Sequence, residues 1–377
     1  MTPAGSAGGA KYSTGRVREE EIIDAPDDHR FCCHRLPTPR AGSAIREKVA
    51  QESVVLGVHR SRRQDRRQGV LVSISSVGNE IRLAALREAL SREKFVRILE
   101  VHSPLSAVIA EHAQGVGPTK RSFHGFWSSS LTDSALRGLP DIELLDSNLR
   151  LSWIDQIFSV STLPLVMDGD TGGRVSHFEY LVRAMERRGV SAVVIEDKSG
   201  EKRNSLLPGK GLHTMAPVEE FCEKISRGKA AQAGTDFMII ARLEGLITGL
   251  PRQEVLDRAG AYVEAGADGL VIHSRSADES LVLDLARELR KRYPHIPLVS
   301  IPTAYPSVTE QELHEAGFRL IIYANHMLRA ATRAMEEVSH RILDHGRALE
   351  AGEVCIETSK ILSMPEDKRP IVRAPRH

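Results

Sequence analysis

Three carboxylates stand at the ends of two apolar runs and are placed to hold a metal ion. Asp168 and Asp170 close the run LPLVMDGD, and Glu196 closes the run AVVIE. Alternate residues of a strand project from one face, so the two aspartates are expected to point the same way. Oxygen ligands with no Cys or His among them suit Mg²⁺ or Mn²⁺ better than zinc. A helix-capping role would explain Asp170 but not Asp168, so the sequence predicts a Mg²⁺ site.

A loop rich in Lys and Gly directly follows Glu196. It reads EDKSGEKRNS and continues as LLPGKGLH before the next helical pattern. Long loops at the end of a strand commonly act as lids that close over a substrate and exclude water. Lys198, Lys202 and Lys210 would favour an anionic substrate. By spacing alone, a solvated charged loop is an equally good interpretation.

The elements that must position these residues are short apolar runs separated by helix-like segments. Such runs are typical of parallel strands that are covered on both faces. Three of them lie in similar segments, ERRGVSAVVIE, EAGADGLVIHS and EAGFRLIIYAN. In each segment a helical pattern ends, Gly follows it and a strand comes next. We count eight runs, at residues 95–102, 125–130, 163–170, 192–197, 237–244, 269–274, 297–302 and 320–325.

A repeat of eight strand–helix units predicts an α/β fold with a closed (β/α)8 TIM-type barrel. An open doubly wound sheet is disfavoured because no G-x-G-x-x-G turn follows any run. We assign residues 79–345 to the barrel, residues 1–78 to a largely irregular N-terminal extension and residues 346–377 to a C-terminal helix or tail. The extension mixes Gly, Ala, Ser, Pro and Arg and has few apolar clusters, so we expect it to be disordered or loosely packed.

Polar residues end all eight runs, which favours an active site at the carboxyl end of the barrel. Any one of them alone is more often a helix cap or a loop residue, but the whole set is dense for positions that follow apolar strands. The set comprises His102, Ser129, Ser130, Asp168, Asp170, Glu196, Asp197, Lys198, Arg242, Glu244, His273, Thr303, Asn325 and His326.

The overall composition excludes several other functions. The 377 residues carry a formal net charge of +1, which gives no global field for nucleic acid or a membrane surface. The basic stretch at residues 60–67 could contact nucleic acid, but no aromatics interleave with its arginines, and a solvated arm is the preferred interpretation. Four scattered cysteines, no apolar run long enough for a membrane span and no secretory signal predict a reduced, cytoplasmic protein.

The motif E-D-K-x-x-x-K-x-N-S, complete from Glu196 to Ser205, resembles the signature of the phosphoenolpyruvate mutase family. That family belongs to the isocitrate lyase/phosphoenolpyruvate mutase superfamily of barrels. The resemblance runs from about Leu86 to about Ile342. It includes GFWSSSL, GLPD, DGDTG, ARLE, IHS, IPT and NHMLRA in that order along the chain.

The resemblance implies a Mg²⁺-dependent enzyme that interconverts phosphoenolpyruvate and phosphonopyruvate, the carbon–phosphorus bond formation of phosphonate biosynthesis. Mg²⁺ would be held by Asp168, Asp170 and Glu196, partly through water. The substrate carboxylate would be cradled by Trp127, Ser129, Ser130 and Leu131. Arg242 and His273 would grip the phosphoryl and bridging oxygens, Asp141 would orient groups near the metal, and Lys202, Asn204 and Ser205 would lie on a gating loop.

Differences between the motifs of this chain and those of related enzymes limit the alternative activities. Lyases of the superfamily carry a K-K-C-G-H motif, and the loop of this chain has no cysteine, which argues against carbon–carbon cleavage. Phosphonopyruvate hydrolase stays open, although that enzyme tends to have Thr where this chain has Asn204. The family also implies a homodimer or homotetramer that exchanges a C-terminal helix. Residues 327–350 could serve as that helix or as the last helix of the chain's own barrel.

Overall fold

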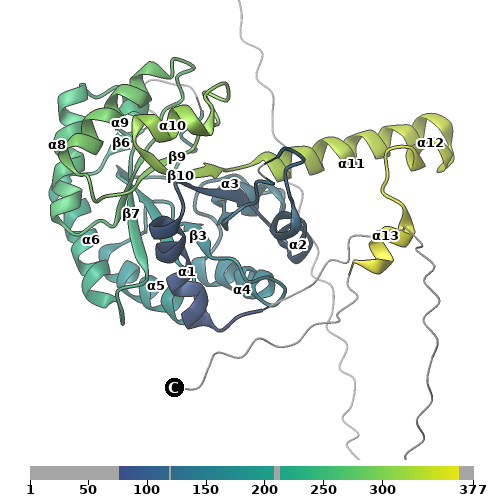
Figure 1. Ribbon diagram of the computed structural model, residues 1–377, viewed down its shortest axis with the longest axis horizontal. Helices are drawn as coiled ribbons and strands as arrows, with labels where there is room; N and C mark the ends of the chain where they lie inside the picture. Colours follow the sequence, from purple (N-terminus) through teal and green to yellow (C-terminus); the bar gives the residue numbers. More distant parts are fainter. Residues whose placement is uncertain (1–75, 119, 208–212, 365–377) are drawn as a thin grey trace, which may run out of the picture. The chain divides into compact units, whose positions relative to one another are not determined.

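The structure, a computed structural model, describes residues 76–118, 120–207 and 213–364, and within them eight parallel strands close into a barrel (Figure 1). Each strand overlaps one of the eight predicted runs, which confirms the (β/α)8 fold. Around the barrel the order is β1-β10-β9-β8-β7-β4-β3-β2. The strands are β1 (Val96–Glu100), β2 (Gly125–Ser128), β3 (Leu165–Asp168), β4 (Ala192–Glu196), β7 (Met238–Leu243), β8 (Gly269–Ile272), β9 (Leu298–Ser300) and β10 (Phe318–Tyr323).

Helices connect the strands, and a short hairpin of β5 (Lys198–Ser199) and β6 (Thr214–Met215) follows β4. Two of the predicted glycine caps are present, because Gly189 and Gly317 end helices in the left-handed conformation with φ of 80° and 111°. The helices are α1 (Asn79–Arg92), α2 (Pro104–His112), α3 (Ser130–Ala135), α4 (Ser147–Phe158), α5 (Val175–Arg188), α6 (Val218–Ala231), α7 (Gly245–Thr248), α8 (Arg252–Glu264), α9 (Ser280–Arg292), α10 (Glu310–Ala316), α11 (His326–His345), α12 (Leu349–Gly352) and α13 (Thr358–Ser363).

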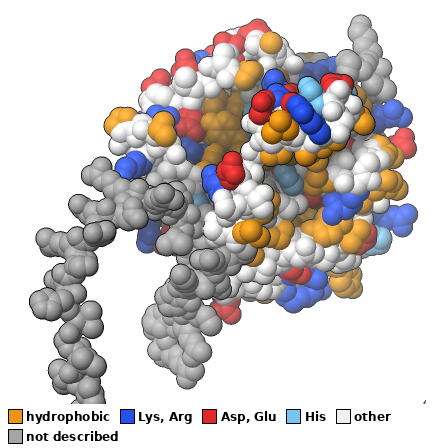
Figure 2. Space-filling model, turned by 90° about the vertical axis from the view of Figure 1, so that its right-hand side faces the viewer, with side chains coloured by type: hydrophobic (Ala, Val, Ile, Leu, Met, Phe, Trp, Pro, Cys, Tyr) orange, Lys and Arg blue, Asp and Glu red, His pale blue; other side chains and the backbone are white. Residues whose placement is uncertain are grey.

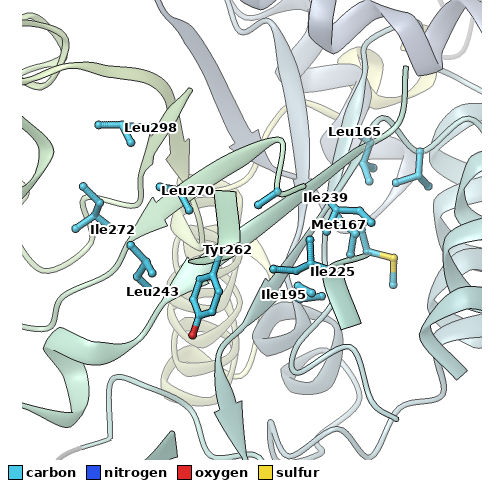
Figure 3. Packing of buried hydrophobic residues seen from close by; sticks show 14 of the residues in the cluster. Leu165, Met167, Ile195, Ile225, Ile239, Leu243, Tyr262, Leu270, Ile272 and Leu298 are labelled. Atoms are coloured by element: carbon cyan, nitrogen blue, oxygen red, sulfur yellow. The ribbon is translucent and has the colours of Figure 1, made fainter. Parts of the chain in front are cut away.

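The apolar core has two layers because alternate residues of each strand face opposite sides. Leu165, Met167 and Ile239 lie in the outer layer between the strands and the helices, as Figure 3 shows. Val166 and Ile240 belong to the inner layer that fills the barrel. This alternation explains why the strands appear in the sequence as continuous apolar runs.

Helix α1 closes the amino-terminal end of the barrel. Leu86 is fully buried and joins the inner layer of the core. The buried guanidinium of Arg82 donates through Nη2 to the carbonyl oxygens of Phe158 (3.3 Å) and Ser161 (2.6 Å). Burial lowers the pKa of Arg82 to about 10, although Glu111 opposes that effect. The interior of the barrel is therefore open only at its carboxyl end, as far as the described residues show.

Helix α11 extends away from the barrel (Figure 1). Counting only the residues that the structure describes, none of its side chains is buried. Its first turn is tied to β1, because the Leu328 backbone N–H donates to Oε2 of Glu100 (3.1 Å). A cavity of about 690 Å³ lies beside β1 and β10, with Leu99, Phe123 and Tyr323 in its wall.

Several sequence expectations fall on chain ends where the description stops. Apart from residues 76–78, the predicted extension lies outside the described residues, as do the basic stretch at 60–67 and Cys32 and Cys33. The C-terminal segment is described as far as residue 364. Within the part of the chain that the structure describes, no helix is both long and apolar enough to cross a membrane.

Candidate active site

A small pocket of about 60 Å³ opens at the carboxyl end of the barrel, and its lining includes every residue that the family resemblance assigned to the site. Of the other polar strand ends predicted, Thr303 and Asn325 also line it, whereas His102, Asp197, Lys198, Glu244 and His326 do not. Lys210 of the predicted lid lies outside the described residues. The lining residues come from the ends of seven strands, from the segment between α3 and α4 and from the loop after β4, so segments far apart in the chain meet here. The predicted residues in its lining are Trp127, Ser129, Ser130, Leu131, Asp141, Asp168, Asp170, Glu196, Lys202, Asn204, Ser205, Arg242 and His273.

Asp168 and Asp170 form the acidic floor of the pocket at the end of β3. Oδ2 of Asp168 accepts hydrogen bonds from the Ser130 hydroxyl (2.9 Å) and backbone N–H (3.3 Å). Asp170 has a φ of 54°, so the chain turns sharply between the two carboxylates. A Cβ on Gly169 would lie 2.5 Å from Cγ2 of Val193, and this position therefore requires glycine.

The two aspartates have pKa values that move in opposite directions. Burial alone would raise the pKa of Asp168, but the charges of Lys202, Arg242 and Arg150 hold it below its usual value. The pKa of Asp170 is raised to about 6 by burial and by the neighbouring charge of Asp168. Asp168 is thus the more firmly ionised carboxylate of the pair.

Lys202 from the loop after β4 reaches into this acidic floor. Its Nζ donates to Oγ of Ser130 (2.7 Å), to Oδ1 of Asp141 (2.6 Å) and to Oδ1 of Asp170. Asn204 donates through Nδ2 to the other oxygen of Asp141, Oδ2, at 2.7 Å. Asp141 therefore receives both polar side chains of the loop and holds it over the pocket.

A second lysine fastens the loop from the opposite side. The buried Nζ of Lys198 donates to the carbonyl oxygen of Arg203 (2.9 Å) and to Oγ of Ser205 (2.8 Å). The same ammonium lies 3.2 Å from Oε1 of Glu196. The described part of the loop is thus connected directly to a predicted metal ligand.

Arg242, Glu244 and His273 form a charged cluster across β7 and β8. Nε of Arg242 donates to Oε1 of Glu244, and Nδ1 of His273 lies 2.9 Å from the same oxygen and 3.0 Å from Nη2 of Arg242. Burial and the charge of Arg242 lower the pKa of His273, which favours a neutral ring near pH 7. The pKa of Glu244 lies well below its usual value because Arg242 and His273 outweigh its burial.

The carboxylate set fits a magnesium ion that keeps part of its water shell. Among the described residues, no group of three or more His, Cys, Asp or Glu side chains is close enough together to hold a metal unaided. Mg²⁺ usually takes only one or two protein carboxylates and completes its shell with water and substrate oxygens. Oε1 of Glu196 is buried and, beyond its ion pair with Lys198 at 3.2 Å, makes no hydrogen bond within the described chain, so it can accept one from a bound water.

The sequence assigned no role to several residues that line the pocket, nor to Arg150, which supports the end of β3 without lining the pocket. Arg150 of α4 donates through Nε to Asp133 (2.8 Å) and through Nη1 to the carbonyl oxygen of Asp168 (2.5 Å). In the sequence, Arg150 could have been noticed because it shares one face of a helical pattern with the apolar residues Ile154 and Ile157. Leu206, Ile301, Thr303, Ala324 and Asn325 complete the lining. Thr303 and Asn325 were recognisable as polar strand ends, whereas the apolar residues look like core.

Comparisons with known proteins identify similar chains. Residues 86–343 match the family model described as phosphoenolpyruvate phosphomutase. Phosphonopyruvate hydrolase of Variovorax sp. (strain Pal2) is 38% identical over 290 residues, which cover 76% of this chain and 95% of the relative. Phosphoenolpyruvate phosphomutase of Tetrahymena pyriformis is 36% identical over 248 residues, covering 66% and 79%. The crystal structure of phosphoenolpyruvate phosphomutase from Streptomyces platensis subsp. rosaceus superposes with a TM-score of 0.69 at 38% identity, covering 75% and 94%.

Proposed function

The chain belongs to the phosphoenolpyruvate phosphomutase family of enzymes, and on this premise we propose that it is a Mg²⁺-dependent phosphoenolpyruvate mutase. Family membership confirms the resemblance found in the sequence and the prediction of an enzyme. The proposed reaction interconverts phosphoenolpyruvate and phosphonopyruvate. Because it forms a carbon–phosphorus bond, it would open phosphonate biosynthesis.

The observation that favours a mutase is Asn204 in its complete loop motif. Its amide is docked 2.7 Å from Oδ2 of Asp141, and this contact holds the loop over the pocket. In the proposed reaction the bond between phosphorus and the enol oxygen breaks, and the enolate carbon takes the phosphoryl group. Water must be kept out between these steps, and a docked loop bearing an amide donor is suited to that task.

The residues of the pocket supply positioning and charge rather than a covalent nucleophile. Phosphoryl transfer proceeds through a loose, metaphosphate-like species that needs alignment and positive charge. We assign the carboxylate of the substrate to the segment of Trp127, Ser129, Ser130 and Leu131. We assign its phosphoryl and bridging oxygens to Arg242 and His273. A Mg²⁺ ion held by Asp168, Asp170 and Glu196 would neutralise the enolate and phosphoryl oxygens.

Phosphonopyruvate hydrolysis is the second candidate, since the hydrolase of Variovorax is 38% identical to this chain. The same pocket would then admit a water molecule that captures the phosphoryl group. The two reactions differ in the fate of phosphorus and not in how the substrate is held. We therefore expect the loop residue at position 204 to decide between the mutase and the hydrolase reaction.

The test is to incubate the purified protein with phosphonopyruvate and Mg²⁺ and to follow phosphorus by ³¹P NMR. A mutase gives the phosphoenolpyruvate resonance, whereas a hydrolase gives inorganic phosphate together with pyruvate. A matched reaction with excess EDTA should show no turnover. Inorganic phosphate as the first product would exclude the mutase.

Asn204→Thr tests the residue on which the choice rests. The shorter side chain lacks the amide that reaches Asp141, so we expect the inorganic phosphate fraction to rise severalfold at the expense of phosphoenolpyruvate. Arg203→Gln changes an exposed neighbour in the same loop and should leave the product ratio unchanged. An unaltered ratio in Asn204→Thr would remove our reason for preferring the mutase.

We further propose that the enzyme is a homodimer or homotetramer that exchanges α11. The helix presents an apolar stripe of Leu328, Ala331, Met335, Val338 and Ile342 at successive turns. The view toward the α11–α13 side of the molecule has hydrophobic side chains exposed to solvent (Figure 2). The apolar cavity beside β1 and β10 is where an eighth barrel helix would pack. A partner's α11 could fill it.

A further inference from the structure

A second cavity lies at the opposite end of the barrel from the active site. It has a volume of about 510 Å³ and adjoins the starts of β7, β9 and β10 together with the last turns of α1 and α9. Its size falls in the range of small-molecule sites. We call it the basal pocket and define it by Arg87, Asp268, Arg290, His295 and Arg319.

The basal pocket is strongly cationic. Its lining includes three arginines and, among the described residues, one carboxylate, Asp268. That carboxylate already has its partners, because Oδ1 accepts from Nη2 of Arg87 (2.8 Å) and Oδ2 accepts from Nζ of Lys229 (2.8 Å). Asp268 thus cannot neutralise the remaining guanidinium groups, and the pocket keeps a positive charge.

Among the described residues, no acidic group pairs with the guanidinium of Arg290. Within the described ranges it makes no ion pair or side-chain hydrogen bond, and it is half-buried. Two other arginines of α9 behave differently, since Arg287 pairs with Asp284 (2.6 Å) and Arg292 pairs with Glu288. The helix therefore has acidic partners for its exposed arginines and none for the one in the pocket.

The aliphatic part of Arg290 is held in place by a glycine. A Cβ on Gly317 would lie 2.8 Å from Cβ and 3.0 Å from Cγ of Arg290, and Gly317 has a φ of 111°. Glycine at this position lets the arginine stem pack directly on the backbone before β10. Two residues later, Arg319 is anchored by Nη2 to the carbonyl oxygens of Leu90 (2.7 Å) and Glu93 (3.0 Å). The stem of Arg290 and the guanidinium of Arg319 are consequently held in place.

We propose that the basal pocket binds a tetrahedral oxyanion, the phosphate or phosphonate group of a small molecule. A guanidinium offers a planar fork of N–H donors that matches phosphate oxygens, and preorganised arginines lose little entropy on binding. The site is separate from the substrate pocket and does not depend on which reaction the enzyme catalyses. His295, exposed at the rim, adds a further donor.

Isothermal titration of the full-length protein with inorganic phosphate tests this site. Arg290→Gln should weaken phosphate binding at least tenfold, and Arg290→Lys should restore part of it. Arg287→Gln, on the same helix but paired and outside the pocket, is the matched control and should bind like wild type. Turnover of phosphonopyruvate should be unchanged in all three variants. Methylphosphonate and malonate separate recognition of a tetrahedral oxyanion from recognition of any dianion.

Arg242→Gln distinguishes the basal pocket from the active site. Phosphate binding should persist in that variant, because the basal arginines are intact. Loss of binding in Arg242→Gln with retention in Arg290→Gln would overturn the proposal, as would malonate binding as tightly as phosphate. If Arg290→Gln does not fold, His295→Glu changes an exposed residue of the same pocket and should also weaken binding. Unaltered binding in His295→Glu would then count against the site.

Discussion

Asp168 is the more firmly ionised of the two aspartates at the end of β3. Lys202, Arg242 and Arg150 keep its pKa low despite burial, and Ser130 orients it with two hydrogen bonds. We expect Asp168→Ala to lower kcat by about 10²- to 10³-fold or more, because the proposed Mg²⁺ ion, which would contact the substrate oxygens, would lose an ionised ligand. Circular dichroism should show an intact fold. Asp257→Ala, an exposed aspartate on α8, is the control, and wild-type turnover by Asp168→Ala would contradict the metal assignment.

If Glu196 is a metal ligand, as we propose, metal binding should depend on pH. Its pKa is raised to about 8, chiefly by burial, so the carboxyl holds a proton near neutral pH. A metal requires the ionised form, and Mg²⁺ binding should therefore release a proton and tighten as the pH rises from 6.5 to 8.5. The slope approaches tenfold per pH unit below the pKa. Titration calorimetry in buffers of different ionisation enthalpy measures the released proton.

Glu196→Gln removes the titrating group while keeping its shape. The variant should bind Mg²⁺ more weakly and with little dependence on pH over the same range. Equal proton release by the variant and wild type would assign the proton to another group, such as Asp170.

At the scale of elements, Gly169 sets the spacing of two neighbouring strand ends. A methyl group there meets Cγ2 of Val193 at 2.5 Å and the carbonyl oxygen of Val194 at 3.1 Å, so β3 and β4 must move apart. We expect Gly169→Ala to destabilise the protein by about 1–3 kcal/mol and to weaken Mg²⁺ binding, because both predicted ligand strands shift. Denaturant unfolding and metal titration measure the two effects. Gly117→Ala, in a loop with no atom within 4 Å of the added methyl, should change neither.

The strands and the polar ends of the barrel could be predicted because their physical causes are local. A parallel strand covered on both faces must be apolar throughout, and the residue after it meets solvent at the mouth of the barrel. The predicted site residues consequently fell into one pocket. Arg150 was missed because it comes from a helix and acts by its reach across to β3, which no spacing rule encodes.

Other features could not be predicted because the same sequence pattern is compatible with two different structures. Ile301 and Ala324 line the pocket, yet apolar residues at a strand end look the same whether they face substrate or core. The stripe on α11 has the same spacing whether the helix packs on its own barrel or on another chain. Long-range geometry decides such cases.

At the scale of the whole molecule, α11 determines assembly in our proposal. Met335→Glu together with Ile342→Glu places two charges on the apolar stripe and should convert the oligomer into a monomer, seen by light scattering during size-exclusion chromatography. Because oligomers gain stability by mass action, Tm of the wild type should rise with protein concentration and Tm of the variant should not. His340→Glu alters the opposite face of the helix and should leave the mass unchanged. A monomeric wild type would contradict the proposal.

The closure of the barrel base by α1 has a practical consequence. Asn79 lies against Gly189, beside the start of β4, whereas the substrate pocket opens at the strands' other ends. A linker attached directly before Asn79 would therefore hold the barrel at the amino-terminal ends of its strands. If the protein were immobilised on a bead through such a linker, the substrate pocket would face the solvent and not the bead.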